Sequence, residues 1–183
     1  MSSIITKIAD MLHGKGKELY GGELVTQAQH ALQCATLAEA AKSSDKLITA
    51  CLLHDIGHLL DDDFERLAAE KDLYHEDLGE AFLSEWFDDE VCQPVKLHVA
   101  AKRYFCATND KYLGKLSAAS VQSLKLQGGI MSDEEVKKFR SHPYYQDALR
   151  LRVWDDLAKD PDLITPDIAH FMSYVENSLS KDI

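Results

Sequence analysis

The sequence predicts an all-α fold, in which one helical domain spans residues 1–183. In most windows the apolar residues recur at intervals of three and four, which is the period of an amphipathic helix. Only 4 prolines and 9 glycines punctuate the chain, which is too few for the turns of a many-stranded fold. The length suits a single core that is large enough to fold without covalent staples.

The apolar stripes place the individual helices. Long stripes cover residues 24–37, 47–56, 77–87 and 91–105, and shorter helices are predicted at 117–126, 132–140, about 143–156 and about 166–180. Gly57 ends the second stripe. The run Ser132-Asp133-Glu134-Glu135 has the form of a capping box, which marks the start of a helix. Loops are expected at 14–22 and 128–129, the first of them mobile because it is rich in glycine. The acidic run at 61–63 is expected to be a solvated turn or a helix start.

Composition and charge exclude several classes of partner. The formal net charge of −11 disfavours nucleic acid, because phosphate backbones are bound mainly by lysine and arginine. A small anionic substrate remains compatible, since a few local cations can reverse the potential inside a pocket. No apolar run is long enough to span a bilayer and no signal peptide is evident, so we expect no membrane partner.

The four cysteines are Cys34, Cys51, Cys92 and Cys106. They form no C-x-x-C pair, and three of them lie among apolar residues at helical spacing. We therefore predict buried free thiols, which fit a cytoplasmic protein.

The sharpest local signal is LLHDIGH at 52–58, at the end of an apolar helix. A charged aspartate and imidazoles beside leucines are costly to bury unless something pairs with them. His54 and Asp55 can reach one metal ion from the same turn, and a carboxylate can also bridge two ions. Taken alone, the His-Asp pair is better explained as a solvated helix end.

The neighbouring helices change that interpretation. His30 lies one helix upstream, His75 opens the next helix downstream, and His98 lies within the one after that. Metal sites in helical bundles are built in this way, from side chains on facing helices. Nitrogen and oxygen ligands in these numbers suit a first-row metal, although spacing alone does not distinguish iron from manganese.

The order His…His-Asp…His…His…Asp resembles that of the HD-domain superfamily of metal-dependent phosphohydrolases. More closely, the chain resembles the HD-domain mixed-valent diiron oxygenases of the PhnZ and TmpB type, which cleave carbon–phosphorus bonds. The likeness runs from about residue 19 to about residue 156. Its most specific segments are HVAAKRY at 98–104 and RVWD at 152–155, and the others are 20–23, 29–35, 52–58, 74–76 and 127–129.

The resemblance implies a ligand set and a cofactor. One iron would be held by His30, His54, Asp55 and Asp155, and the other by His75 and His98, with Asp55 bridging the two. The cofactor would be two iron ions in a mixed-valent Fe(II)/Fe(III) state, with O2 as co-substrate. Two carboxylates offset part of the charge of two ions, and six protein ligands leave positions open for substrate and dioxygen.

Two residues follow metal ligands at helical spacing. His58 lies four residues after His54, and Lys102 lies four residues after His98. By the resemblance Lys102 binds the phosphonate, and His58 can hydrogen-bond one of its oxygens. The alternatives are a surface histidine at a helix end and a lysine that snorkels to solvent.

Two further substrate contacts are predicted near the end of the resemblance. Arg152 lies three residues before Asp155, and it either pairs with the phosphonate or braces that aspartate. Ser120 corresponds to a substrate-contacting serine of the family, although a helix-cap role is an equal alternative.

Tyr20 and Glu23 precede the first ligand helix. In the resembling family this pair acts as a gate, in which the tyrosine occupies the second iron until substrate binds and the glutamate then faces the substrate amine. Without the resemblance, a packing tyrosine and an acid at a helix start would be the simpler interpretation.

The activity implied is oxidative cleavage of the C–P bond of a 1-hydroxy-2-aminoethylphosphonate or its N-trimethyl analogue, giving phosphate and glycine or glycine betaine. The alternative is an HD-domain phosphohydrolase acting on a nucleotide or small phosphate ester, in which a metal-bound water attacks phosphorus. A non-catalytic metal-binding regulator is a third hypothesis. Lys102, Arg152 and the Tyr20/Glu23 pair favour the oxygenase, while the oligomeric state and the choice between the two amines stay open.

Overall fold

A computed structural model describes residues 3–20, 22–60 and 74–180. Within these ranges the chain is mainly helical and has no β-strand, only two isolated bridges, so the all-α prediction is confirmed. The helices are α1 (Ser3–His13), α2 (Gln27–Ala40), α3 (Asp45–Leu53), α5 (His75–Leu83), α6 (Asp89–Thr108), α7 (Ala118–Leu126), α8 (Asp133–Arg140), α9 (Tyr145–Leu157) and α10 (Ile168–Asn177), with short 3₁₀ turns η1 (Lys15–Lys17), η2 (Ile56–Leu59) and η3 (Leu113–Lys115). The predicted turn or helix start at 61–63 lies outside the described residues.

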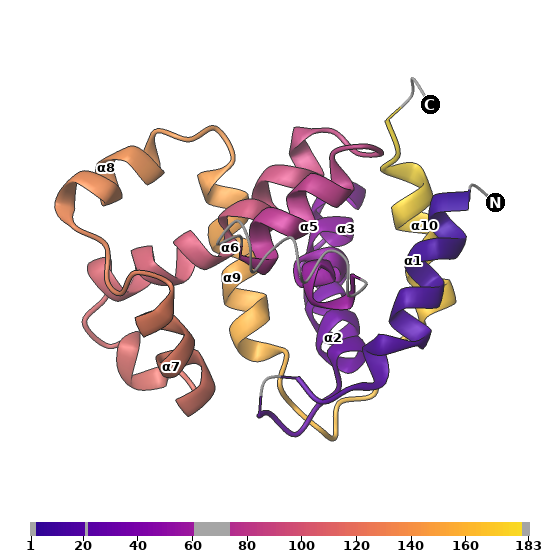
Figure 1. Ribbon diagram of the computed structural model, residues 1–183, viewed down its shortest axis with the longest axis horizontal. Helices are drawn as coiled ribbons and strands as arrows, with labels where there is room; N and C mark the ends of the chain where they lie inside the picture. Colours follow the sequence, from indigo (N-terminus) through magenta and orange to yellow (C-terminus); the bar gives the residue numbers. More distant parts are fainter. Residues whose placement is uncertain (1–2, 21, 61–73, 181–183) are drawn as a thin grey trace.

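Four helices form the centre of the molecule. Helices α2, α3, α6 and α9 pack against one another, and α5 packs on α6. Figure 1 shows α1 and α10 together at one end and α7 and α8 at the other. All the predicted metal ligands come from the central helices, from the turn after α3 or from the first residue of α5.

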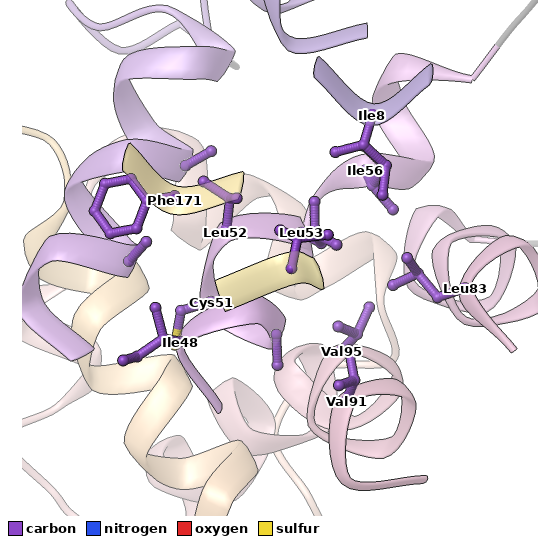
Figure 2. Packing of buried hydrophobic residues seen from close by; sticks show 14 of the residues in the cluster. Ile8, Ile48, Cys51, Leu52, Leu53, Ile56, Leu83, Val91, Val95 and Phe171 are labelled. Atoms are coloured by element: carbon purple, nitrogen blue, oxygen red, sulfur yellow. The ribbon is translucent and has the colours of Figure 1, made fainter. Parts of the chain in front are cut away.

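The main hydrophobic core surrounds the end of α3 (Figure 2). Leu52, Leu53 and Ile56 are each at most 2% exposed, and they pack with Val95 of α6 and Phe171 of α10 in one cluster. Burial of each such side chain contributes about 1.5–3 kcal/mol. Because these residues flank His54 and Asp55, the core that stabilises the fold also fixes the position of the ligands.

A smaller apolar cluster lies at the other end of α6. It consists of Ala101, Tyr104, Met131, Phe139 and Ala148, so it joins α6 to α8 and α9. Nearby, the Arg103 guanidinium donates to the carbonyl oxygen of Gly129 at 2.8 Å.

Capping explains where several helices begin. The capping box predicted at Ser132 is confirmed, and its hydroxyl accepts from the N–H of Glu135. Thr26 and Gln29 form a second capping box at the start of α2. Because α2 begins after Thr26, the prediction that Leu24 starts a core stripe is wrong, and Leu24 is 81% exposed.

Helix α1 was not among the predicted elements. Its buried face is formed by Ile4, Ile5, Ile8 and Leu12, which recur at helical spacing. All four cysteines are free and buried, as predicted. None of the helices in the described ranges is both long and apolar enough to cross a lipid bilayer.

Candidate metal centre

The predicted ligands surround the floor of a cavity of about 350 Å³. Asp55, His75, His98 and Asp155 line it, whereas His30 and His54 lie behind them and are fully buried. All six predicted substrate contacts also line this cavity: Tyr20, Glu23, His58, Lys102, Ser120 and Arg152. The fold therefore brings together every site residue that the sequence indicated.

Two histidines face each other on one side of Asp55. The Nε2 atoms of His30 and His54 are 3.1 Å apart. The Nδ1–H of His30 donates to the carbonyl oxygen of Ala158, and that of His54 to the carbonyl oxygen of Cys51, each at 2.8 Å. With both Nδ1 atoms engaged as donors, the Nε2 atoms of the neutral imidazoles would present lone pairs to the same space.

A second histidine pair lies on the other side. The Nε2 atoms of His75 and His98 are 3.2 Å apart. The Nδ1–H of His98 donates to the carbonyl oxygen of Val95 at 2.6 Å, and Nδ1 of His75 lies 3.2 Å from an oxygen of Glu76. Such outward Nδ1 contacts are the supports that orient metal-binding histidines.

Asp55 lies between the two pairs. Its Oδ2 is 3.3 Å from Nε2 of His54 and 3.7 Å from Nε2 of His30. Its Oδ1 is 3.3 Å from Nε2 of His75 and 3.5 Å from Nε2 of His98. Each carboxylate oxygen thus serves a different histidine pair, which is the arrangement of a bridging ligand.

Asp155 lies beside the pair formed by His30 and His54. Its Oδ1 is 3.4 Å from Nε2 of His30, and its Oδ2 forms an ion pair with Nη1 of Arg152 at 2.7 Å. The other Arg152 groups contact Asp156 through Nη2 and the Tyr112 hydroxyl through Nε. Arg152 therefore braces Asp155, the second of the two roles considered for it, while it also lines the cavity.

The unsatisfied atoms of this centre require cations. Asp55 Oδ2 and Asp155 Oδ1 are buried and accept no hydrogen bond. Although burial opposes it, His54 and His75 hold the pKa of the Asp55 carboxyl well below the usual range. Arg152 and His30 do the same for the pKa of the Asp155 carboxyl. Buried anions opposite imidazole lone pairs are costly unless a cation lies between them, so the donor set fits two metal ions.

Gly57 allows the turn after α3 to lie against the start of α5. A Cβ atom at this position would lie 2.0 Å from the carbonyl oxygen of His75. We expect Gly57→Ala to displace His75, to lower the free energy of unfolding by about 2 kcal/mol, and to reduce metal content. Denaturant unfolding measures the free energy of unfolding, and elemental analysis measures the metal content. The control is Gly114→Ala, because a Cβ atom at that position meets nothing within 4 Å. Wild-type stability of the Gly57→Ala protein would show that the close approach of Gly57 to His75 is not required.

The cavity lining also includes cationic side chains, among them Lys102. Lys102 is 3% exposed and donates to Ser123 Oγ at 2.7 Å, so the snorkelling alternative is wrong. Burial and Arg152 lower the pKa of Lys102 to about 8. His58 lies at the exposed rim of the cavity, where its ring stacks on that of His75 with 4.2 Å between centroids.

Ser120 is buried and does not cap its helix. The cap of α7 is Ser117, whose hydroxyl accepts from the N–H of Ser120 at 3.1 Å. The Ser120 hydroxyl lines the cavity, where it accepts from Ser117 Oγ at 3.2 Å and from Lys159 Nζ at 3.1 Å.

The predicted gate residues cover the centre. The Tyr20 ring stacks on His30, with 3.9 Å between centroids and 14° between planes. Burial and the nearby Asp55 and Asp155 carboxylates raise the pKa of its phenol well above the usual range. Oε1 of Glu23 is buried without a hydrogen-bond partner.

Several residues at the site are absent from the prediction, and three of them contact predicted site residues. Glu76 supports His75, Ser123 binds Lys102, and Lys159 contacts Ser120. Glu76 could have been found, because it is adjacent to a predicted ligand. Lys159 follows the end of α9, so helical spacing from Asp155 does not predict where its side chain lies.

Comparisons with known proteins agree with this centre. The sequence model of the HD domain family matches residues 28–142. The chain is 40% identical to a "[1-hydroxy-2-(trimethylamino)ethyl]phosphonate dioxygenase (glycine-betaine-forming)" of Leisingera caerulea, over 98% of this chain and 92% of that protein. It is 41% identical to a "Hydroxymethylphosphonate dioxygenase" of Gimesia maris, over 96% of this chain and 88% of that protein.

With the donor set in place and nearly full-length identity to two such proteins, the chain belongs to the HD-domain family, and within it to the PhnZ- and TmpB-like group.

Proposed function

We propose that this protein is a diiron oxygenase that cleaves the C–P bond of a 1-hydroxyphosphonate with dioxygen. The substrate head proposed is 2-aminoethyl or its N-trimethyl form, giving phosphate and glycine or glycine betaine. The single observation that carries the proposal is Asp55, whose two oxygens face two separate histidine pairs below a cationic cavity. The printed names of both relatives, which are phosphonate dioxygenases, support it.

The proposed ligands of one ion are His30, His54, Asp55 and Asp155. Those of the other are His75, His98 and Asp55. When bound, two irons supply the redox chemistry by which dioxygen oxidises the carbon that bears the hydroxyl group and phosphorus. The reaction balances without an external reductant: R–CH(OH)–PO3H2 plus O2 gives R–COOH plus H3PO4. We propose the mixed-valent state from the resemblance alone.

The protein's own side chains bind and orient the substrate. Lys102 and Arg152 line the same cavity as Asp55 and Asp155, and their positive charges would hold a phosphonate dianion there. Ser120 and His58 offer further hydrogen bonds to its oxygens. Glu23 would face a cationic head, and Tyr20 would cover His30 and limit the entry of water.

The experiment is a phosphate-release assay. Protein loaded with Fe(II) and ascorbate is given each hydroxyphosphonate, with dioxygen present and absent. We expect phosphate only when dioxygen is present. Release that does not depend on dioxygen, or turnover of phosphate esters alone, would identify a phosphohydrolase instead.

The pKa of Lys102 gives the proposal a pH dependence. The ammonium is charged below about pH 8 and neutral above it. Because only the charged form attracts the phosphonate, we expect kcat/KM to fall as the pH rises through this value. Lys102→Arg, which keeps its charge, should lose this decline. A wild-type profile that stays flat well above pH 8 would show that Lys102 does not bind the substrate.

A further inference from the structure

Lys159 lines the cavity, and hydrogen bonds hold the residues on either side of it. The residue before it, Ala158, accepts a hydrogen bond from His30 at 2.8 Å. The residue after it, Asp160, exchanges two hydrogen bonds with Gln33 of α2, one donated by its backbone N–H at 3.1 Å and one accepted by its carbonyl oxygen at 2.7 Å. The backbone on both sides of Lys159 is therefore fixed to the helix that carries His30.

The side chain of Lys159 reaches three predicted site residues. Its Nζ donates to Ser120 Oγ at 3.1 Å, lies 3.6 Å from Glu23 Oε1, and lies 5.9 Å from the centre of the Tyr20 ring. Its side chain is only 14% exposed. These contacts join α7, the segment after α9 and the residues before α2 across one opening.

The ion pair with Glu23 is loose. Within the described residues Glu23 Oε1 is buried and lacks a hydrogen bond, because Lys159 Nζ lies 3.6 Å away, within ion-pair distance but beyond hydrogen-bond distance. A buried carboxylate oxygen in this state favours any cation or donor that the cavity admits. Lys159 supplies the only charge of opposite sign recorded against it among the described residues.

We propose that Lys159 is a specificity-determining residue, which occupies the cationic position beside Glu23 and so weakens selection for substrates with a cationic head. This inference rests on the proposed function, and it concerns which hydroxyphosphonate the same cavity prefers. A substrate ammonium at Glu23 must compete with the Lys159 ammonium and is repelled by it. A hydroxymethylphosphonate has no such head, so the pair can stay intact when it binds.

The test compares two probes on one protein. The dissociation constants of 1-hydroxy-2-aminoethylphosphonate and hydroxymethylphosphonate are measured by calorimetry on iron-loaded protein without dioxygen, so that no turnover is needed. The quantity of interest is the preference, defined as the dissociation constant of the hydroxymethyl probe divided by that of the aminoethyl probe. Effects on the shared phosphonate cancel in this ratio.

We expect Lys159→Met to raise the preference about ten-fold, as removal of one charge at this distance from a partly buried site predicts. Lys159→Arg keeps the charge and should keep the wild-type ratio. Glu23→Gln should lower the ratio instead. Lys125→Met, which removes an exposed lysine of α7, is the matched control for the change in net charge and should leave the ratio unchanged.

Metal content and thermal unfolding establish that each variant is folded, and Lys159→Gln replaces Lys159→Met if that protein is not. If both probes weaken equally in the neutral variant, Lys159 binds the phosphonate and the inference is wrong. An unchanged ratio in Glu23→Gln overturns it as well. If neither probe binds the wild-type protein, the proposed function fails first, and the inference fails with it.

Discussion

Replacement of His98 by alanine is expected to leave a folded protein that holds one metal ion instead of two and has no measurable turnover. His98 and His75 face Asp55 Oδ1, while the other histidine pair and Asp155 stay intact. Loss of an ion that supplies several kcal/mol of transition-state stabilisation lowers kcat by about a thousand-fold or more. Elemental analysis and phosphate release measure the two effects.

The matched control is His13→Ala, because His13 is an exposed histidine at the end of α1. It should keep both ions and full activity. Two ions bound to the His98→Ala protein would mean that this histidine is not a ligand.

Asp55→Asn is expected to reduce metal binding more than His98→Ala does. Each oxygen of Asp55 faces a different histidine pair, so removal of its charge weakens both positions at once. We expect less than one ion per chain and no turnover, in contrast to the single ion kept by His98→Ala. The amide fits the same space, so the loss comes from charge and coordination and not from packing.

Asp156→Asn is the matched control for this substitution. Asp156 contacts Arg152 and Tyr112, and it contacts no histidine of the described ranges. It should retain both ions, whereas retention of both ions by Asp55→Asn would exclude a bridging role for Asp55.

The parts of the fold with strong periodicity were predictable. Helices α7 and α8 lie within one residue of their predicted bounds, and the start of α8 follows from the chemistry of its capping box. The start of α2 was misplaced, since Leu24 is apolar but exposed. Apolar spacing alone does not reveal which apolar residues precede a cap.

The candidate site was predictable where ligands recur on successive helices, and where residues follow them at helical spacing. The geometry around Asp55 could be obtained only from the structure. Residue spacing does not indicate which carboxylate oxygen of Asp55 faces which histidine pair. Lys159 needed the structure as well, since its position depends on hydrogen bonds to residues more than a hundred positions away. Tertiary contacts of this kind leave no local pattern in the chain.

The most direct test of the account is the ratio of dioxygen consumed to phosphate released by the iron-loaded protein acting on a 1-hydroxyphosphonate. An oxygen electrode and a phosphate assay on the same sample give both quantities. The balanced reaction predicts one dioxygen for each phosphate, with no reductant consumed. Phosphate released without any uptake of dioxygen would contradict oxidative cleavage at this centre.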